Sequence, residues 1–406
     1  MKHMKNKKIK INFKKFIPAV LILAAFFYII LFRISAFFNK DGISPDVTNT
    51  SNMNVQNDIT INMSVIGDIM CHTTNFYDAH SKSDDSYDFS HVFKNITNYI
   101  SDADIAIGNL ETTFSGKSRG YTGYPTFNTP EQLGKNLKDL GLDVITTANN
   151  HSIDKGYSGI VSTLDFLDEF GLDHTGTART QEEQDTILIK DINGIKIAFL
   201  TYTYGTNGIT VPSDKSYCVN LIDTELIKKH IDSAKELGAD IICTSMHWGD
   251  EYKLKQNTKQ EELANFLFEN GVDIILGSHP HVLEPMEKRT ITLEDGSTKD
   301  CFVIYSLGNF MSGQYFENTK STVILDIQIT KYANEEVSID SINYTPLYLN
   351  DKGSRASSRT RYELIDIRSA IENYDSGLDK SIGESLYKTL KTELTKIEKT
   401  VGQPIQ

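Results

Sequence analysis

The stretch Asp273-Ile-Ile-Leu-Gly-Ser-His-Pro-His281 joins a short apolar run to a polar turn that carries two histidines. The stretch Ile241-Ile-Cys-Thr-Ser-Met-His-Trp-Gly249 makes the same change from apolar to polar residues. Short apolar runs bounded by glycine and polar turns are typical of buried strands. Segments with helical periodicity separate these runs along the chain, and this alternation predicts an α/β fold.

The same pattern can be followed along most of the chain. Strands that end in a polar turn are expected at 59–66, 104–107, 144–147, 241–245, 273–276 and 302–305. Amphipathic segments predict helices near 90–101, 130–140, 157–170, 223–237 and 258–270. A hairpin around Asn193-Gly194 is expected to join 187–190 to 196–202. Further strands are expected at 322–330 and 337–349, and further helices at 359–373 and 380–399.

Each of the first six strand ends carries an acid, an amide or an imidazole, nearly always beside a glycine that lets another backbone approach closely. One such turn is more often structural, so the prediction depends on the repetition. In open α/β sheets, ligands bind outside the carboxyl ends of the strands. If these ends converge, the ligands on offer are those of Asp68, Glu111, Asn150, His247, His279 and His281.

Carboxylate, amide and imidazole ligands suit Mn²⁺, Fe or Zn²⁺ better than a soft metal. Six ligands exceed what one ion needs, so we expect two divalent ions that share a carboxylate. Two ions about 3.5–4 Å apart can lower the pKa of a water molecule between them and hold both oxygens of a phosphoryl displacement.

The composition is that of a folded protein, with 39% hydrophobic and 23% charged residues among 406. It excludes disordered, collagen-like and disulfide-scaffold chains, and the four cysteines form no C-x-x-C pair. Residues 1–33 hold seven lysines, one arginine and no acid, which leaves a net charge of −21 on the remainder. A body this acidic argues against nucleic acid as a partner.

The N-terminal region predicts a membrane anchor. No residue from Phe16 to Phe32 is charged, and seven lysines precede this run. As a helix the run spans roughly 25 Å, and extension to residue 38 would cross a bilayer core of about 30 Å. The positive-inside rule keeps the N-terminus in the cytosol and makes the rest extracytoplasmic. A cleaved signal peptide is the alternative, and the lack of a small-x-small site after the run favours a retained single-pass anchor.

These features predict five segments. They are a cytoplasmic basic segment at 1–15, a transmembrane anchor at 16–38, a flexible linker at 39–58, a main domain at 59–350 and a helical C-terminal extension at 351–406.

An ordered set of motifs resembles the CapA/PgsA family over about residues 60–315. The motifs are Gly67-Asp-Ile-Met70, Gly108-Asn-Leu-Glu111, Ala148-Asn-Asn-His151, His247-Trp-Gly249, Ser278-His-Pro-His281 and Ser306-Leu-Gly-Asn-Phe310. The resemblance implies a membrane-anchored bacterial protein of poly-γ-glutamate capsule synthesis. It also implies the fold of calcineurin-like metallophosphoesterases, a layered sandwich of mixed β-sheets flanked by helices.

The resemblance assigns roles to single positions. Asp68 and His281 match ligands of a first metal, and Glu111 stands where the superfamily usually has a bridging aspartate. Ligands of the second metal are matched by Asn150, His247 and His279. His151 matches the catalytic histidine, which meets developing charge or protonates the leaving oxygen.

The chain also departs from the superfamily pattern. The first motif is usually Asp-x-His, but Met70 stands two positions after Asp68. His72 is a candidate for the missing ligand, and a helix-capping role for it is the equal alternative. Asn109 and Asn309 are candidates for a metal ligand or for a group that supports one.

Three further residues are candidates for substrate binding. Tyr204 and Asn207 lie in a segment, 201–208, that resembles CapA-like sequences and can equally be a glycine-rich turn. Arg119 lies in the long loop 112–129, which is long enough to form a lid. An arginine there could pair with a phosphate or a γ-carboxylate, although such loop cations are usually just solvated.

Taken together, the sequence predicts a metal-dependent, phosphoesterase-type site in an anchored protein of poly-γ-glutamate synthesis or export. Its expected partners are the membrane, an anionic polymer or phosphoester, and subunits of a membrane synthase. One alternative is a non-catalytic, polymer-binding subunit of such a synthase. Another is a general metal-dependent phosphodiesterase or nucleotidase.

Overall fold

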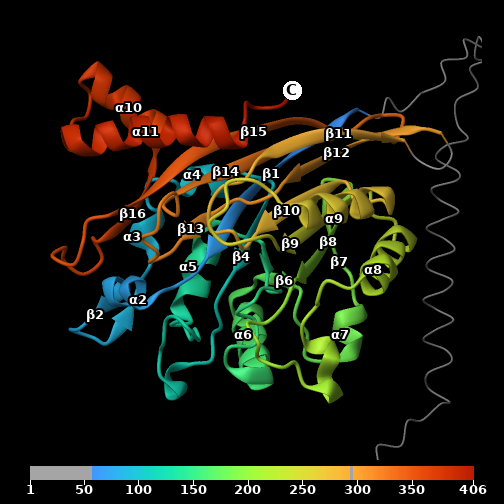
Figure 1. Cartoon of the computed structure of the whole chain (residues 1–406), viewed down its shortest axis with the longest axis horizontal. Coiled ribbons are helices and arrows are strands. Elements are labelled where there is room, and N and C mark those ends of the chain that lie inside the picture. Colours follow the sequence, from blue (N-terminus) through green and yellow to red (C-terminus); the bar gives the residue numbers. More distant parts are fainter. Residues whose placement is uncertain (1–56, 293–295) are drawn as a thin grey trace, which may run out of the picture. The chain divides into compact units, whose positions relative to one another are not determined.

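The computed structural model describes residues 57–292 and 296–406. These residues form two large β-sheets that lie face to face, with helices on the outer face of each (Figure 1). The predicted segments 1–15 and 16–38, and the predicted linker up to residue 56, lie outside the described residues. Within the described ranges, no helix is long and apolar enough to cross a membrane.

The larger sheet has the strand order β16-β15-β14-β1-β4-β5-β6, and β13 also pairs with β1. Its strands are β1 Ile59–Ile69, β4 Ile105–Leu110, β5 Val144–Thr146, β6 Asp173–Thr175, β13 Asn309–Met311, β14 Ser321–Lys331, β15 Val337–Asp351 and β16 Tyr362–Asp366. The strands β1, β4, β5 and β6 run parallel, so their carboxyl ends share one edge. The strands β14, β15 and β16 continue the sheet in antiparallel fashion.

The smaller sheet has the order β11-β12-β10-β9-β8-β7. Its strands are β7 Leu188–Ile192, β8 Ile195–Thr203, β9 Ile241–His247, β10 Ile274–Ser278, β11 Met286–Thr292 and β12 Thr298–Ile304. The four central strands run parallel, and antiparallel strands form both edges. The predicted hairpin is confirmed as β7 and β8. A separate two-stranded ribbon joins β2 His80–Ser81 to β3 Ser86–Tyr87.

Alternation along β1 explains why it lies between two cores. Ile61, Met63 and Val65 are buried between the two sheets, while Ile66 and Ile69 are buried under the helices. Successive side chains of a strand point to opposite faces, so the exposed Thr60 and Asn62 alternate with buried residues in the first half of β1, whereas its second half is buried on both faces. Each fully buried side chain of this kind contributes about 1.5–3 kcal/mol.

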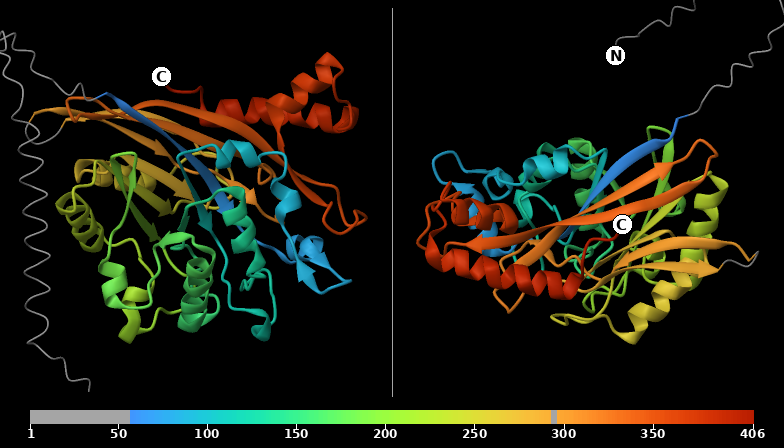
Figure 2. Two further views of the ribbon diagram at one scale, coloured as in Figure 1. Left: turned by 180° about the vertical axis from the view of Figure 1, so that it is seen from behind. Right: turned by 90° about the horizontal axis from the view of Figure 1, so that it is seen from above.

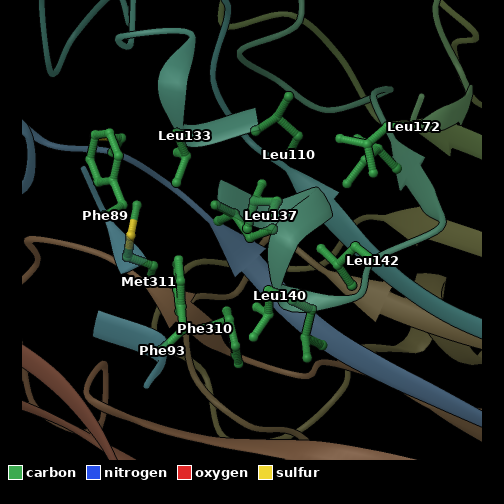
Figure 3. Packing of buried hydrophobic residues seen from close by; sticks show 14 of the residues in the cluster. Phe89, Phe93, Leu110, Leu133, Leu137, Leu140, Leu142, Leu172, Phe310 and Met311 are labelled. Carbon is green, nitrogen blue, oxygen red and sulfur yellow. The ribbon is translucent and has the colours of Figure 1, made fainter. Parts of the chain in front are cut away.

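Helices cover the larger sheet through leucines at helical spacing. Leu133, Leu137 and Leu140 of α5 point toward Leu110 of β4 and the neighbouring Leu142 (Figure 3). On this side lie α2 Thr73–Ala79, α3 Ser90–Phe93, α4 Thr97–Ser101, α5 Gln132–Leu140 and α6 Gly156–Phe170. The helices α8 Thr224–Glu236 and α9 Thr258–Glu269 cover the smaller sheet, and a short α7 spans Gln181–Asp185.

The C-terminal region contributes a strand as well as helices. The predicted helix at 359–373 was wrong over residues 362–366, which form β16 against β15. Tyr362 and Leu364 are buried on one face and alternate with the partly exposed Glu363, which is the period of a strand. The helices α10 Ile367–Ser376 and α11 Gly383–Val401 follow and lie along β14 and β15 (Figure 2).

Two glycines allow the close approaches that the sequence predicted near the strand ends. A Cβ atom at Gly277 would lie 1.8 Å from the carbonyl oxygen of Tyr305, and one at Gly67 would lie 2.1 Å from that of Gly308. Any side chain at either position would therefore push neighbouring strands apart. These contacts hold together the edge at which the polar strand ends meet.

Candidate metal centre

The polar residues predicted at the strand ends meet in one buried cluster. The larger sheet supplies Asp68 from β1, Glu111 after β4 and Asn150 after β5, and the smaller sheet supplies His247 from β9 with His279 and His281 after β10. The Nε2 atom of His247 lies 3.0 Å from Oδ1 of Asn150 and 3.6 Å from Oε1 of Glu111. Side chains of the two sheets therefore contact each other directly.

Two groups of ligand atoms share one carboxylate. Asp68, Glu111 and His281 form the first group, which we call the first site. Glu111, His247 and His279 form the second group, the second site, and Asn150 contacts it through His247. Within each group the ligand atoms lie within 4.8 Å of one another. These two groups have the members that the resemblance implies for the two metals, and a third group joins Glu251 to His279 and His281 across both sites.

Glu111 is the residue that most clearly makes this cluster a candidate cation site. Its side chain is fully buried, and neither carboxylate oxygen has a hydrogen-bond partner. Burial, and then the nearby charge of Asp68, hold the pKa of Glu111 well above its usual value. Burying a carboxylate without a hydrogen-bond partner costs free energy of folding. An ion in each site would give each oxygen of Glu111 a partner.

The histidines of the second site are in the form that binds metal. Burial lowers the pKa of His247 well below its usual value and that of His279 to about 3. Both rings are therefore neutral, which leaves a lone pair on one nitrogen for a cation. The Nδ1 atom of His279 is buried and has no hydrogen-bond partner.

Polar neighbours fix the orientation of the ligands. Asn309 donates from Nδ2 to Gln314, so its Oδ1 accepts from Nδ1 of His281 at 3.1 Å and the Nε2 lone pair of that ring stays free. Ser278 contacts Nδ1 of His247 at 2.9 Å, and Nε2 of the same ring faces Oδ1 of Asn150 at 3.0 Å. Such partners set the ring orientation and raise ligand basicity.

Asp68 is held by two donors. Asn109 donates from Nδ2 to Oδ1 of Asp68 at 2.8 Å, and the backbone N–H of His279 donates to Oδ2 at 3.2 Å. Asn109 and Asn309 thus both contact a predicted ligand, which favours the supporting role for each.

The backbone of the His-Pro-His turn is strained. His279 has a φ of +98° and His281 a φ of +61°, in the region that side chains other than glycine rarely adopt. Such strain costs of the order of 1–3 kcal/mol and concentrates at functional sites. It aims both imidazoles at the acids of the larger sheet.

His151 lies beside the cluster and is oriented by an acid. Its Nδ1 atom is 2.8 Å from Oδ2 of Asp154, and Nδ2 of Asn207 lies 3.3 Å from its Nε2. The ring of Phe127, from the loop 112–129, meets the imidazole edge-on at 4.7 Å between centroids. The loop predicted as a lid therefore covers one side of His151 with an apolar ring.

Two of the three predicted substrate-binding residues lie at the cluster. The ring of Tyr204 is 4.5 Å from that of His279, and Oδ1 of Asn207 accepts from Asn150 at 3.2 Å. Arg119 instead donates to the carbonyl of Lys155 and to Ser158 at the start of α6.

His72 precedes α2 and caps it. Its backbone N–H donates to Oδ1 of Asn75 at 2.9 Å, and its Nδ1 accepts from the N–H of Gly313 at 3.2 Å. A neutral ring bonded in this way carries its proton on Nε2 and has no lone pair there for a metal. None of the ligand groups found among the described residues includes His72, so the capping alternative is favoured.

A family model described as "Bacterial capsule synthesis protein PGA_cap" matches residues 62–314. The chain belongs to this family. The resemblance of its motifs to the CapA/PgsA family is thereby confirmed.

Two relatives and one solved structure show how far the similarity extends. "Capsule biosynthesis protein CapA" of Bacillus anthracis is 27% identical over 277 residues, which cover 66% of this chain and 64%, less than two thirds, of that protein. "PGA biosynthesis protein CapA" of Bacillus subtilis is 28% identical over 297 residues, covering 72% of this chain and 74% of the relative. The calcineurin-like phosphoesterase YfkN from Bacillus subtilis matches 84% of this chain and 98% of its own, at 14% identity and a TM-score of 0.42. An overlap of that size carries no argument about function.

Three residues of the cluster were not predicted from the sequence. Asp154 orients His151, Ser278 contacts His247, and Glu251 reaches His279 and His281 from a loop. Two features of the sequence could have indicated Asp154 and Ser278. Asp154 follows His151 by three positions, and Ser278 directly precedes the His-Pro-His turn. Glu251 follows His247-Trp-Gly249 by two positions and gave no signal of its own.

Proposed function

We propose that this chain is a metal-dependent phosphoesterase-type protein of poly-γ-glutamate capsule synthesis or export. Membership of the capsule synthesis family supports the biological role. The observation that carries the chemistry is Glu111, because a buried carboxylate without partners is shared by two sets of metal ligands. The site residues fit two divalent ions of the Mn, Fe or Zn type.

The proposed first site comprises Asp68, Glu111 and His281, and the proposed second site comprises Glu111, Asn150, His247 and His279. Bound there, the ions would supply Lewis acidity, which lowers the pKa of water and stabilises charge on phosphoryl oxygens. The chain itself supplies neutral imidazoles and a preformed pair of sites, so little has to rearrange when the ions bind.

His151 is the proposed proton donor to the leaving oxygen. Asp154 holds its Nδ1 atom, which fixes the ring and leaves Nε2 as the atom that exchanges a proton. The amide of Asn207 contacts that Nε2 atom and also Asn150 of the second site. These contacts support a position of His151 next to the residues of the second site, and the ring of Phe127 packs edge-on against the imidazole.

The proposal also places the protein in the membrane. Residues 16–38 would form a retained anchor with the N-terminus in the cytosol and the main domain outside. There the site could act on a phosphoester or on an anionic polymer such as poly-γ-glutamate, beside membrane synthase subunits. The net charge of −21 on residues 34–406 argues against a broad cationic track for the polymer, so bound ions would have to bridge acid groups of polymer and protein.

Hydrolysis of generic phosphoesters tests the catalytic proposal. The full-length protein is assayed with Mn²⁺, Fe²⁺ or Zn²⁺ on phosphomonoester and phosphodiester substrates, with ion content measured in parallel. His151→Ala should lower kcat about 10²–10⁴-fold with ion content unchanged. His80→Ala is the matched control, since His80 contacts Asp85 on the β2–β3 ribbon.

Two outcomes would contradict parts of this proposal. Bound ions without hydrolysis over the whole panel, in a strain whose polymer production still requires the protein, would favour the non-catalytic subunit. A mature protein that lacks residues 1–35 by mass spectrometry would replace the anchor with a cleaved signal peptide.

A further inference from the structure

The two sites of the candidate centre have unequal ligand sets. The second site has two imidazoles, one amide and the shared carboxylate, while the first has only Asp68, Glu111 and His281. In the superfamily motif that the sequence resembles, a histidine stands where this chain has Met70. A divalent ion there would lack one protein ligand unless another residue supplies it.

Met70 does not fill this gap. Its side chain is buried, and its sulfur lies 4.0 Å from Nε2 of Gln314. A thioether is also a soft ligand, which hard divalent ions avoid. Gln314 extends the same Nε2 toward the hydroxyl of Tyr252 at 3.4 Å, so the loop that carries Tyr252 borders the side of the site where Met70 lies.

Glu251, the residue before Tyr252, reaches from this loop to both histidines of the His-Pro-His turn, His281 of the first site and His279 of the second. One of its carboxylate oxygens lies within 4.8 Å of ligand nitrogens of His279 and His281. The Nδ1 atom of His279 is buried and has no hydrogen-bond partner. Unlike Asp68 and Glu111, Glu251 is exposed, so its carboxylate lies at the open side of the centre.

The loop is tied to the turn that carries the histidines. Tyr252 has a φ of +63°, and its N–H donates to the carbonyl of Pro280, between the two histidines, at 2.8 Å. Gly249 has a φ of +87° and packs so closely on Gln260 that a Cβ atom there would lie 2.8 Å from the Gln260 amide. The position of Glu251 is therefore set from both sides before an ion binds.

We propose that Glu251 is the missing ligand of the first cation, in place of the histidine that Met70 replaces. This inference rests on the proposed two-ion site and adds a residue to it. The first ion is then held by three carboxylates and one imidazole, and the second by one carboxylate, one amide and two imidazoles. The oxygen-rich first site favours Mn²⁺, and the nitrogen-rich second site favours Zn²⁺ or Fe.

The test compares ion binding by the full-length protein and its Glu251→Gln variant. Calorimetric titration with Mn²⁺ should give two ions per chain for the wild type. In the variant, one ion should bind at least about 10-fold more weakly while the other is unchanged. Glu262→Gln, which removes an exposed acid from α9, is the matched control and should bind both ions normally.

A rescue variant tests whether Glu251 acts as a ligand. Met70→His combined with Glu251→Gln should restore binding of the weakened ion, because an imidazole again stands in the position of the superfamily ligand. Failure to restore it, or two ions of wild-type affinity in Glu251→Gln, overturns the inference. Loss of both ions in Glu251→Gln overturns it too, because Glu251 would then support the whole centre. A wild-type protein that binds no ion refutes the proposed function itself, and the Glu251 inference with it.

Discussion

The two sheets bring different chemistry to the candidate centre. The larger sheet contributes the buried acids Asp68 and Glu111 and the amide of Asn150. The buried ligands of the smaller sheet are the imidazoles of His247, His279 and His281, and the exposed Glu251 follows β9. Without ions, the acid side holds a buried carboxylate that lacks partners, while the imidazole side is neutral. The acid side therefore depends on ions or protons for its stability, and the imidazole side does not.

Neither of the two ligand groups that share Glu111 can form from one sheet alone. Each site combines ligands of both sheets, so the centre exists only when the sandwich is assembled. Bound cations would pair the acids of one sheet with the lone pairs of the other. Ion binding and packing of the two sheets should accordingly stabilise each other.

Glu111→Gln should have the largest effect, because this residue alone belongs to both sites. We expect loss of both ions and a fall in phosphoesterase activity of at least about 1000-fold. The folded-state pKa of Glu111 is raised, so the stability that its protonated form gives the metal-free protein is present at low pH and is lost as pH rises.

Denaturant unfolding in chelator at pH 5 and pH 8 measures this loss. Metal-free Glu111→Gln should be more stable than the metal-free wild type at pH 8. The difference between their free energies of unfolding should shrink at pH 5. A variant that keeps both ions would show that the two sheets do not meet through Glu111.

Glu284→Gln tests a buried acid that is not a proposed ligand. Glu284 follows His281 by three positions, accepts from Gln260 at 2.7 Å, and has one oxygen without a partner. Burial raises its pKa from 4.5 to about 8. Its stabilising neutral form is therefore fully present below about pH 4.5 and is lost as pH rises toward about 8.

Glu284→Gln should remove this loss of stability. Its free energy of unfolding at pH 8 should exceed that of the wild type by about 2 kcal/mol, the usual cost of an unpaired buried group. The gain should be the same with ions and in chelator, unlike that of Glu111→Gln. A gain seen only in chelator would mean that Glu284 belongs to the ion centre after all.

Ser278→Ala and Asn309→Ala should have the smallest effects, and each should affect one site. Ser278 contacts His247 of the second site, and Asn309 contacts His281 of the first. Loss of either partner should weaken one ion about 10-fold and leave the other unchanged. Competition with a chelator measures the two affinities. Equal weakening of both ions by either variant would contradict the division into two sites.

Much of the centre could be predicted because each ligand follows an apolar run directly. The position of a strand end is a local property, so His247, His279 and Asp68 could be assigned from neighbouring residues alone. The division into two sheets could not, since local patterns do not say which strands pair. The strand β6, with the sequence Asp173-His-Thr175, contains no apolar residue, so no apolar run marks it in the sequence.

The sequence does not reveal residues whose role depends on contacts with distant parts of the chain. Glu251 is an exposed acid in a loop, and only the folded position of Tyr252 against Pro280 brings it to the histidines. The sequence predicts a helix over β16 because charged residues flank its apolar positions, as in an amphipathic helix. Its burial depends on pairing with β15, which the local sequence does not encode.

The position of β1 at the start of the described domain has a mechanical consequence. This strand pairs with β14 on one side and with β4 and β13 on the other, and Asp68 lies near its far end. Tension applied through the chain before Ile59 would act along the axis of β1. It would therefore strain all the hydrogen bonds between β1 and its neighbouring strands together. A domain tethered by its N-terminus would thus resist pulling at its best-supported strand, and force strong enough to displace β1 would dismantle the centre at the same moment.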